Sequence, residues 1–128
     1  MNRKIIITAS ILGMLAVIAG AFGAHGLKPK LSAADLDVWH TAVQYQFYHV
    51  FALLFLSTFS RTRSRLVTLS YYLFVFGILF FSGSLYLLSC SNLLGLTRST
   101  WLGVMTPLGG LLFIAGWIAL AMAAFRNR

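Results

Sequence analysis

Acidic residues are nearly absent from this sequence. Asp35 and Asp37 are the only two among 128 residues, and charged residues of both signs together make up 9%. An average soluble domain has about 25% charged residues, so this composition excludes an ordinary soluble protein. With 59% hydrophobic residues and a mean hydropathy of +0.86, residues 1–128 are predicted to form a single integral membrane domain.

The scarcity of acids and cysteines also limits the possible chemistry. Both aspartates precede the second long apolar run, so no predicted span carries a buried acid for proton coupling or acid-base catalysis. Cys90 is the only cysteine, which excludes an internal disulfide, and no zinc-type spacing of Cys and His is present. We therefore assign no catalytic residue, no metal and no cofactor.

The charges that are present are mostly positive, and ten lysines and arginines give a formal net charge of +8. A nucleic-acid-binding module would carry them on one face of a soluble fold, whereas here they lie in short clusters between apolar runs. Nucleic acid is therefore not expected as a partner. The clusters are better explained as topology signals, because Lys and Arg concentrate on the cytoplasmic side of membrane proteins.

Four apolar runs are long enough to cross a hydrocarbon core of about 30 Å. They cover about residues 5–24, 39–59, 66–89 and 102–125. The connections between them place seven basic residues on one side, Arg3, Lys4, Arg61, Arg63, Arg65, Arg126 and Arg128, and three on the other, Lys28, Lys30 and Arg98. The sequence thus predicts an all-α, up-down-up-down bundle of four transmembrane helices with both termini in the cytoplasm.

Local signals refine these helices. Ser32 followed by Asp35 resembles a capping box, which predicts that the second helix begins at about Ala33. Trp39 and Trp101 are expected as anchors at the external interface. Small residues recur at helical spacing and predict close helix packing, namely Ala9, Gly13, Ala16, Gly20 and Gly23, then Ser70, Gly77 and Ser84, then Gly109, Gly116 and Ala123.

Polar side chains collect in the external half of the predicted spans. Counted at 1.5 Å per residue from His40, taken as the outer boundary, Gln46 lies about 9 Å and His49 about 13 Å inside the membrane. Because all four spans contribute polar, small or helix-breaking residues at this level, we predict an outward-facing pocket or a buried hydrogen-bond network. The candidate ligand-binding residues are His25, Tyr45, Gln46, His49, Ser82, Ser84, Tyr86 and Thr106. A purely structural role is the alternative, because a buried Gln or His can simply bond a neighbouring helix.

The second predicted helix has two polar faces. At 100° per residue, one face carries Ala42, Tyr45, Gln46 and His49, and the other carries Asp37, His40, Gln44 and Tyr48. His40 and His49 therefore point in opposite directions and cannot hold one metal ion. We expect His49 to face the bundle, near Ser84 or residues 106–110.

Four motifs stand out along the chain: GAFGAHGL at 20–27, YQFYH at 45–49, FSGSLYLL at 81–88, and TPLGG followed by GW at 106–117. In order and spacing, over nearly the whole chain, they resemble the YgdD/YwdK-type family of small four-span membrane proteins, a domain of unknown function. The resemblance implies a bacterial inner (cytoplasmic) membrane location and no substrate, cofactor or catalytic residue. The family pattern includes residues that match Gln46 and His49 and does not require a histidine at position 40 or a glutamine at 44. The resemblance therefore favours the face that carries Gln46 and His49.

We therefore expect a non-enzymatic inner-membrane protein whose polar network binds a lipid headgroup, a small solute or a partner helix. Its partners would be membrane lipids and either a second copy or another membrane protein. A small oligomeric channel or permease is an alternative, weakened by the apolar cytoplasmic half of every span. A membrane-embedded enzyme using His49 is a third. A ligand lying between the helices would support binding, whereas a network bonded entirely within itself would argue against it.

Overall fold

The computed structural model describes residues 2–59, 64–96 and 100–126, and every regular element in these ranges is helical. The predicted cations Arg61, Arg63, Arg98 and Arg128 lie outside the described residues. The elements are α1 (Arg3–Phe22), the π-helical η1 (Gly23–Leu27), α2 (Ala33–Phe59), α3 (Arg65–Gly77), the π-helical η2 (Ile78–Ser82), α4 (Gly83–Ser89) and α5 (Thr100–Arg126). The predicted all-α class is confirmed, and each helical segment extends beyond the apolar run that predicted it.

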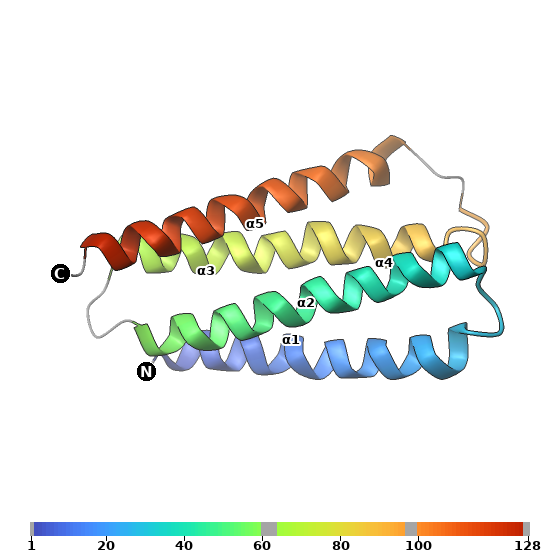
Figure 1. Cartoon of the computed structure of the whole chain (residues 1–128), viewed down its shortest axis with the longest axis horizontal. Coiled ribbons are helices and arrows are strands. Elements are labelled where there is room, and N and C mark those ends of the chain that lie inside the picture. The colour runs from blue at the N-terminus through green and yellow to red at the C-terminus, as the bar shows by residue number, and fades with distance from the viewer. Residues whose placement is uncertain (1, 60–63, 97–99, 127–128) are drawn as a thin grey trace.

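The helical segments alternate in direction along the chain (Figure 1). The start of α1, the end of α2, the start of α3 and the end of α5 lie at one end, and the ends of η1 and α4 and the starts of α2 and α5 lie at the other. We call the first the terminal end. α1 packs mainly against α2, α2 also packs against η2 and α4, and α3 packs against α5. The segments therefore lie beside one another largely in chain order.

Side-chain caps fix where the first two segments begin. The Oδ1 atom of Asn2 accepts hydrogen bonds from the backbone N–H groups of Lys4 and Ile5, at 3.1 and 3.3 Å. The backbone N–H of Asn2 also donates to the carbonyl of Ser57 at 2.9 Å, which ties the start of α1 to the end of α2. At the opposite end, the predicted cap is confirmed, because Ser32 Oγ accepts from the N–H of Asp35 at 3.1 Å and α2 begins at Ala33.

Small residues let the segments approach as their spacing predicted. Ala9 and Ala16 on α1 are fully buried. A methyl group added at Gly77 would meet the ring of Phe113, and one added at Gly116 would meet the ring of Phe74. At Gly109 the neighbour is backbone rather than a ring, because an added Cβ would collide with the backbone of Phe81 in η2. Gly109 is therefore required for α5 to lie against η2.

Three of the four helical segments are long and apolar enough to cross a membrane, namely Arg3–Leu27, Arg65–Ser89 and Trp101–Arg126. α2 is long enough but carries glutamine and histidine side chains in the middle of its apolar stretch. The outer surface of the molecule is largely apolar, with Val17, Phe51 and Leu111 each about 60% exposed (60%, 61% and 62%). A surface of this kind suits hydrocarbon rather than water.

Candidate functional site

Gln46 joins three segments of the fold from a nearly fully buried position on α2. Its Oε1 atom accepts a hydrogen bond from the hydroxyl of Tyr86 on α4 at 2.7 Å. Its Nε2 atom donates to the carbonyl of Leu12 on α1 at 2.8 Å. One side chain therefore connects α1, α2 and α4, and both polar atoms of the amide have partners.

His49 lies one turn along the same face of α2 and is 4% exposed. The indole N–H of Trp117 donates to His49 Nε2 at 3.1 Å, so Nε2 must be the unprotonated nitrogen. Nδ1 then carries the hydrogen and donates to the carbonyl of Tyr45 at 2.7 Å. The network thus assigns a neutral imidazole with both nitrogens occupied. Binding a metal or accepting a proton would require breaking one of these two hydrogen bonds.

The ring of His49 is also held by packing against α5. It stacks on Phe113 with 3.5 Å between ring centroids and 7° between ring planes. The prediction that His49 faces the other helices is confirmed. Its partners, however, are Phe113 and Trp117, further along α5 than the expected residues 106–110, and Ser84 is not among them.

The hydroxyl groups of the candidate site form two further links between segments. Ser82 in η2 is fully buried and donates to the carbonyl of Ala42 on α2 at 2.8 Å. Ser84 on α4 and Thr106 on α5 share a hydrogen bond of 2.6 Å. The interior formed by the described residues therefore contains four separate hydrogen-bonded groups, centred on Gln46, on His49, on Ser82 and on the pair Ser84 and Thr106.

Two of the predicted site residues do not join this interior. His25 is exposed on η1, and Tyr45 is 39% exposed, with its ring 4.8 Å from that of Phe81 and 5.6 Å from that of Tyr48. Within residues 2–59, 64–96 and 100–126, every buried side-chain nitrogen and oxygen has a hydrogen-bond partner. No three His, Cys, Asp or Glu side chains converge on a metal position in that same part of the chain.

Sequence reasoning missed the contribution of Trp39 to the interior. Trp39 was expected as an anchor at the external interface, but its side chain packs against other segments and is only 9% exposed. It packs against Tyr86 with 4.6 Å between centroids, and its indole N–H donates to the carbonyl of Ala19 at 2.9 Å. The signal available was Gly23, whose missing side chain makes room for the indole of Trp39.

Comparison with known proteins agrees with the resemblance in the motifs. Residues 19–110 match the family described as a protein of unknown function, DUF423. The chain belongs to the DUF423 family. It is 44% identical over 126 residues to the UPF0382 membrane protein YwdK of Bacillus subtilis, covering 97% of this chain and 98% of that protein. A UPF0382 membrane protein of Staphylococcus saprophyticus is 47% identical over 124 residues, covering 97% of this chain and 98% of the other. No solved structure matches.

In this DUF423 chain the second polar face of α2 points away from the interior. Its exposed residues follow one another at steps of three and four and form a stripe that we call the outer face: Asp37, His40, Gln44, Tyr48, Phe51 and Phe55. Tyr48 is 54% exposed, and Gln44 is exposed as well. The side-chain amide of Gln44 makes no hydrogen bond within the described part of the chain, which distinguishes it from Gln46, only two residues away.

Proposed function

We propose that this DUF423 protein is one four-span, non-enzymatic domain of the inner membrane that binds a partner helix, and that the partner is a second copy of the chain. α2 has 27 residues and is therefore about 40 Å long, more than the hydrocarbon thickness of about 30 Å. Its inner polar groups bond other segments, which removes the main obstacle to its crossing a bilayer.

The distribution of charges supports cytoplasmic termini. Among the described residues, Arg3, Lys4, Arg65 and Arg126 belong to segment ends at the terminal end of the molecule, against Lys28 and Lys30 after η1 at the other end. Asp35 and Asp37, the only acidic residues, begin α2 at the opposite end. Basic residues concentrate on the cytoplasmic side, so this arrangement favours the terminal end inside the cell.

The exposed position of Gln44 is the observation that favours a partner helix over a ligand in the interior. Its exposed amide lies about 6 Å inside the boundary marked by His40, where hydrocarbon offers it no hydrogen bond. Leaving such a group without a partner in hydrocarbon is unfavourable, and an interhelical hydrogen bond regains about 0.6 kcal/mol on average. A ligand in the interior is less well supported, because Gln46 and His49 already use their polar atoms internally.

A second copy fits this face because the amide is self-complementary. Gln carries both a donor and an acceptor, so two copies related by a twofold axis along the membrane normal can bond Gln44 to Gln44 at equal depth. Tyr48, Phe51 and Phe55 continue the outer face inward and would supply contact area. The steps of three, four and four residues repeat every eleven residues, a pattern that keeps one face of a helix toward its partner in a right-handed supercoil.

The channel alternative has less support. Toward the terminal end, Leu53, Leu56 and Phe74 are fully buried and pack in one apolar cluster with Leu120 and Ala123. A water path through a single chain would have to cross this layer. The channel hypothesis would therefore require a water path between copies of the chain.

Disulfide crosslinking in native membranes tests the proposal. The background is Cys90→Ser, which removes the only cysteine. With Gln44→Cys we expect a crosslinked dimer after mild oxidation. Val104→Cys is the matched control, because Val104 is 61% exposed on α5 near the same end and should give little crosslink. In the same series, Asn92→Cys should react with a membrane-impermeant thiol reagent from outside intact cells.

Purified protein then distinguishes self-association from binding to another protein. After reconstitution, energy transfer between labelled copies should show dimers whose dissociation constant rises about threefold in Gln44→Leu, the factor for an interhelical hydrogen bond of about 0.6 kcal/mol. Equal crosslinking at Gln44 and Val104, or an unchanged dissociation constant, would overturn self-association through this face.

A further inference from the structure

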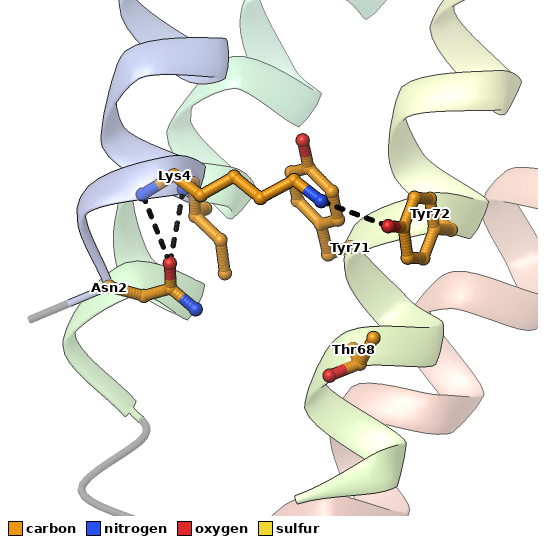
Figure 2. Close-up of a pocket in the computed structure, with 6 residues that line it drawn as sticks. Asn2, Lys4, Thr68, Tyr71 and Tyr72 are labelled. Atoms are coloured by element: carbon orange, nitrogen blue, oxygen red, sulfur yellow. Dashed lines mark hydrogen bonds between the residues drawn. The ribbon is translucent and has the colours of Figure 1, made fainter. Parts of the chain in front are cut away.

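A hollow of about 140 Å³ lies at the terminal end, between the start of α1 and one face of α3 (Figure 2). Pockets for whole metabolites are commonly about 300–1,000 Å³, so this space suits one small chemical group. It is lined by Asn2, Lys4, Ile5, Thr68, Tyr71 and Tyr72. Thr68, Tyr71 and Tyr72 are three and four residues apart and therefore share a face of α3.

Lys4 reaches across the hollow from α1 to α3, as Figure 2 shows. Its ammonium group donates a hydrogen bond to the hydroxyl of Tyr72 at 2.9 Å. It also lies 5.5 Å from the ring centroid of Tyr71 and 5.1 Å from that of Tyr72, within the range of cation–π attraction. Two of its three N–H donors make no other side-chain bond within the described residues.

The surroundings hold the lysine in place. The hydroxyl of Tyr71 bonds that of Thr8 on α1 at 2.7 Å, so the wall of the hollow is braced between two segments. The Oδ1 atom of Asn2 is occupied by the backbone of α1, which leaves its amide nitrogen as a further donor beside the hollow. The side chains around the space therefore offer one cation and several hydrogen-bond donors.

Among the described residues, no acidic side chain lies at this end. The only two acidic side chains in the sequence, Asp35 and Asp37, begin α2. The hollow lies instead beside the end of α2, because Asn2 bonds the carbonyl of Ser57. Arg65 lies three residues before Thr68 and seven before Tyr72 on α3, and so adds positive charge on the same stripe. The hydroxyl oxygen of Tyr72 accepts a hydrogen bond from Lys4 but does not neutralise its charge.

We infer that this hollow binds a phosphate group, with Lys4 as the charged contact and Tyr72, Thr68 and Asn2 as its hydrogen-bonding partners. Charge-assisted hydrogen bonds from ammonium to phosphate oxygens are among the strong ones in proteins. The phosphate comes either from an anionic phospholipid of the adjacent leaflet or from solution, and both have the same chemistry at the site. The inference is independent of self-association through α2.

Binding is tested with the full chain in two arms. In the first, the protein in nanodiscs of phosphatidylcholine is titrated with phosphatidylglycerol, and in the second, the detergent-solubilised protein is titrated with inorganic phosphate. We expect Lys4→Gln to weaken binding about tenfold and Lys4→Arg to restore it to within about threefold. Arg126→Gln is the matched control, because it removes one cation from the same end without touching the hollow, and should change binding less than twofold.

The two arms distinguish a lipid headgroup from a soluble phosphate. A Lys4-dependent signal with phosphatidylglycerol alone assigns the lipid headgroup, and one with inorganic phosphate assigns the soluble anion. Equal weakening by Lys4→Gln and Arg126→Gln in both arms would overturn the inference, because the effect would then be general attraction between charges. If Lys4→Gln does not fold, Tyr72→Phe keeps the ring and removes the hydroxyl, and an affinity for phosphate in Tyr72→Phe equal to that of the unaltered protein would overturn the inference too.

Discussion

Gln44 and Gln46 lie two residues apart on α2 and differ completely in what surrounds them. Gln46 is 4% exposed and bonds both α1 and α4, whereas Gln44 is exposed and its amide has no partner in the described part of the chain. The same contrast separates His49, which is stacked and bonded, from the exposed His40. Rotation about the helix axis, rather than depth in the membrane, decides whether a polar side chain serves the fold or faces outward.

Replacing each histidine with alanine should give the largest difference in stability between the two faces of α2. His49→Ala removes a ring stacked at 3.5 Å on Phe113 and the acceptor of the Trp117 hydrogen bond, and should lower the free energy of unfolding by about 3 kcal/mol. His40→Ala alters an exposed side chain and should change it by less than about 0.5 kcal/mol. Unfolding in mixed detergent micelles measures both, and similar values for the two variants would contradict the division into faces.

Neighbouring glycines on α5 test how the inner face is supported. Gly109→Ala pushes α5 away from the backbone of Phe81 in η2, next to Ser82, which bonds α2. We expect a loss of about 2 kcal/mol, because backbone cannot move aside as a flexible side chain can. In Gly110→Ala the added methyl group would lie 3.9 Å from the ring of Phe81, an ordinary contact, so stability should be unchanged or slightly higher. The same unfolding assay compares the two variants. An unchanged free energy of unfolding in Gly109→Ala would show that the contact between α5 and η2 does not support the inner face of α2.

Much of the fold could be predicted because its causes are local. Apolar runs predicted the four helical segments, and Ser32 predicted the first residue of α2 through a hydrogen bond to an N–H three residues away. Helical counting also placed Gln46 and His49 together on one face, as the structure has them. Hydrogen bonds and rotations within one helix depend on few residues, and sequence pattern is sufficient for them.

The partners across segments could not be predicted in the same way. The bond from Trp117 to His49 joins residues 68 apart, and its formation depends on the tilt and rotation of α5 against α2. Counting depth at 1.5 Å per residue predicted that His49 lies near residues 106–110, because such counting takes no account of how α5 tilts against α2. The two π-helical stretches, η1 and η2, were missed for a related reason, since a π turn follows from packing rather than from residue preferences.

Replacing each glutamine with leucine should have the smallest effect on stability, but it separates the two faces of α2 most clearly. Gln46→Leu removes the bonds to Tyr86 and Leu12 and should lower the free energy of unfolding by about 1 kcal/mol, within the range measured for interhelical hydrogen bonds in membranes. It should leave the dimer dissociation constant unchanged at temperatures where the chain stays folded. Gln44→Leu should do the reverse, with unchanged unfolding of the monomer and a weaker dimer, because the Gln44 amide makes no hydrogen bond within residues 2–59, 64–96 and 100–126. Unfolding and energy-transfer titrations on the same samples measure both quantities. If Gln46→Leu weakened association and Gln44→Leu destabilised the monomer, the roles assigned to the inner and outer faces of α2 would have to be exchanged.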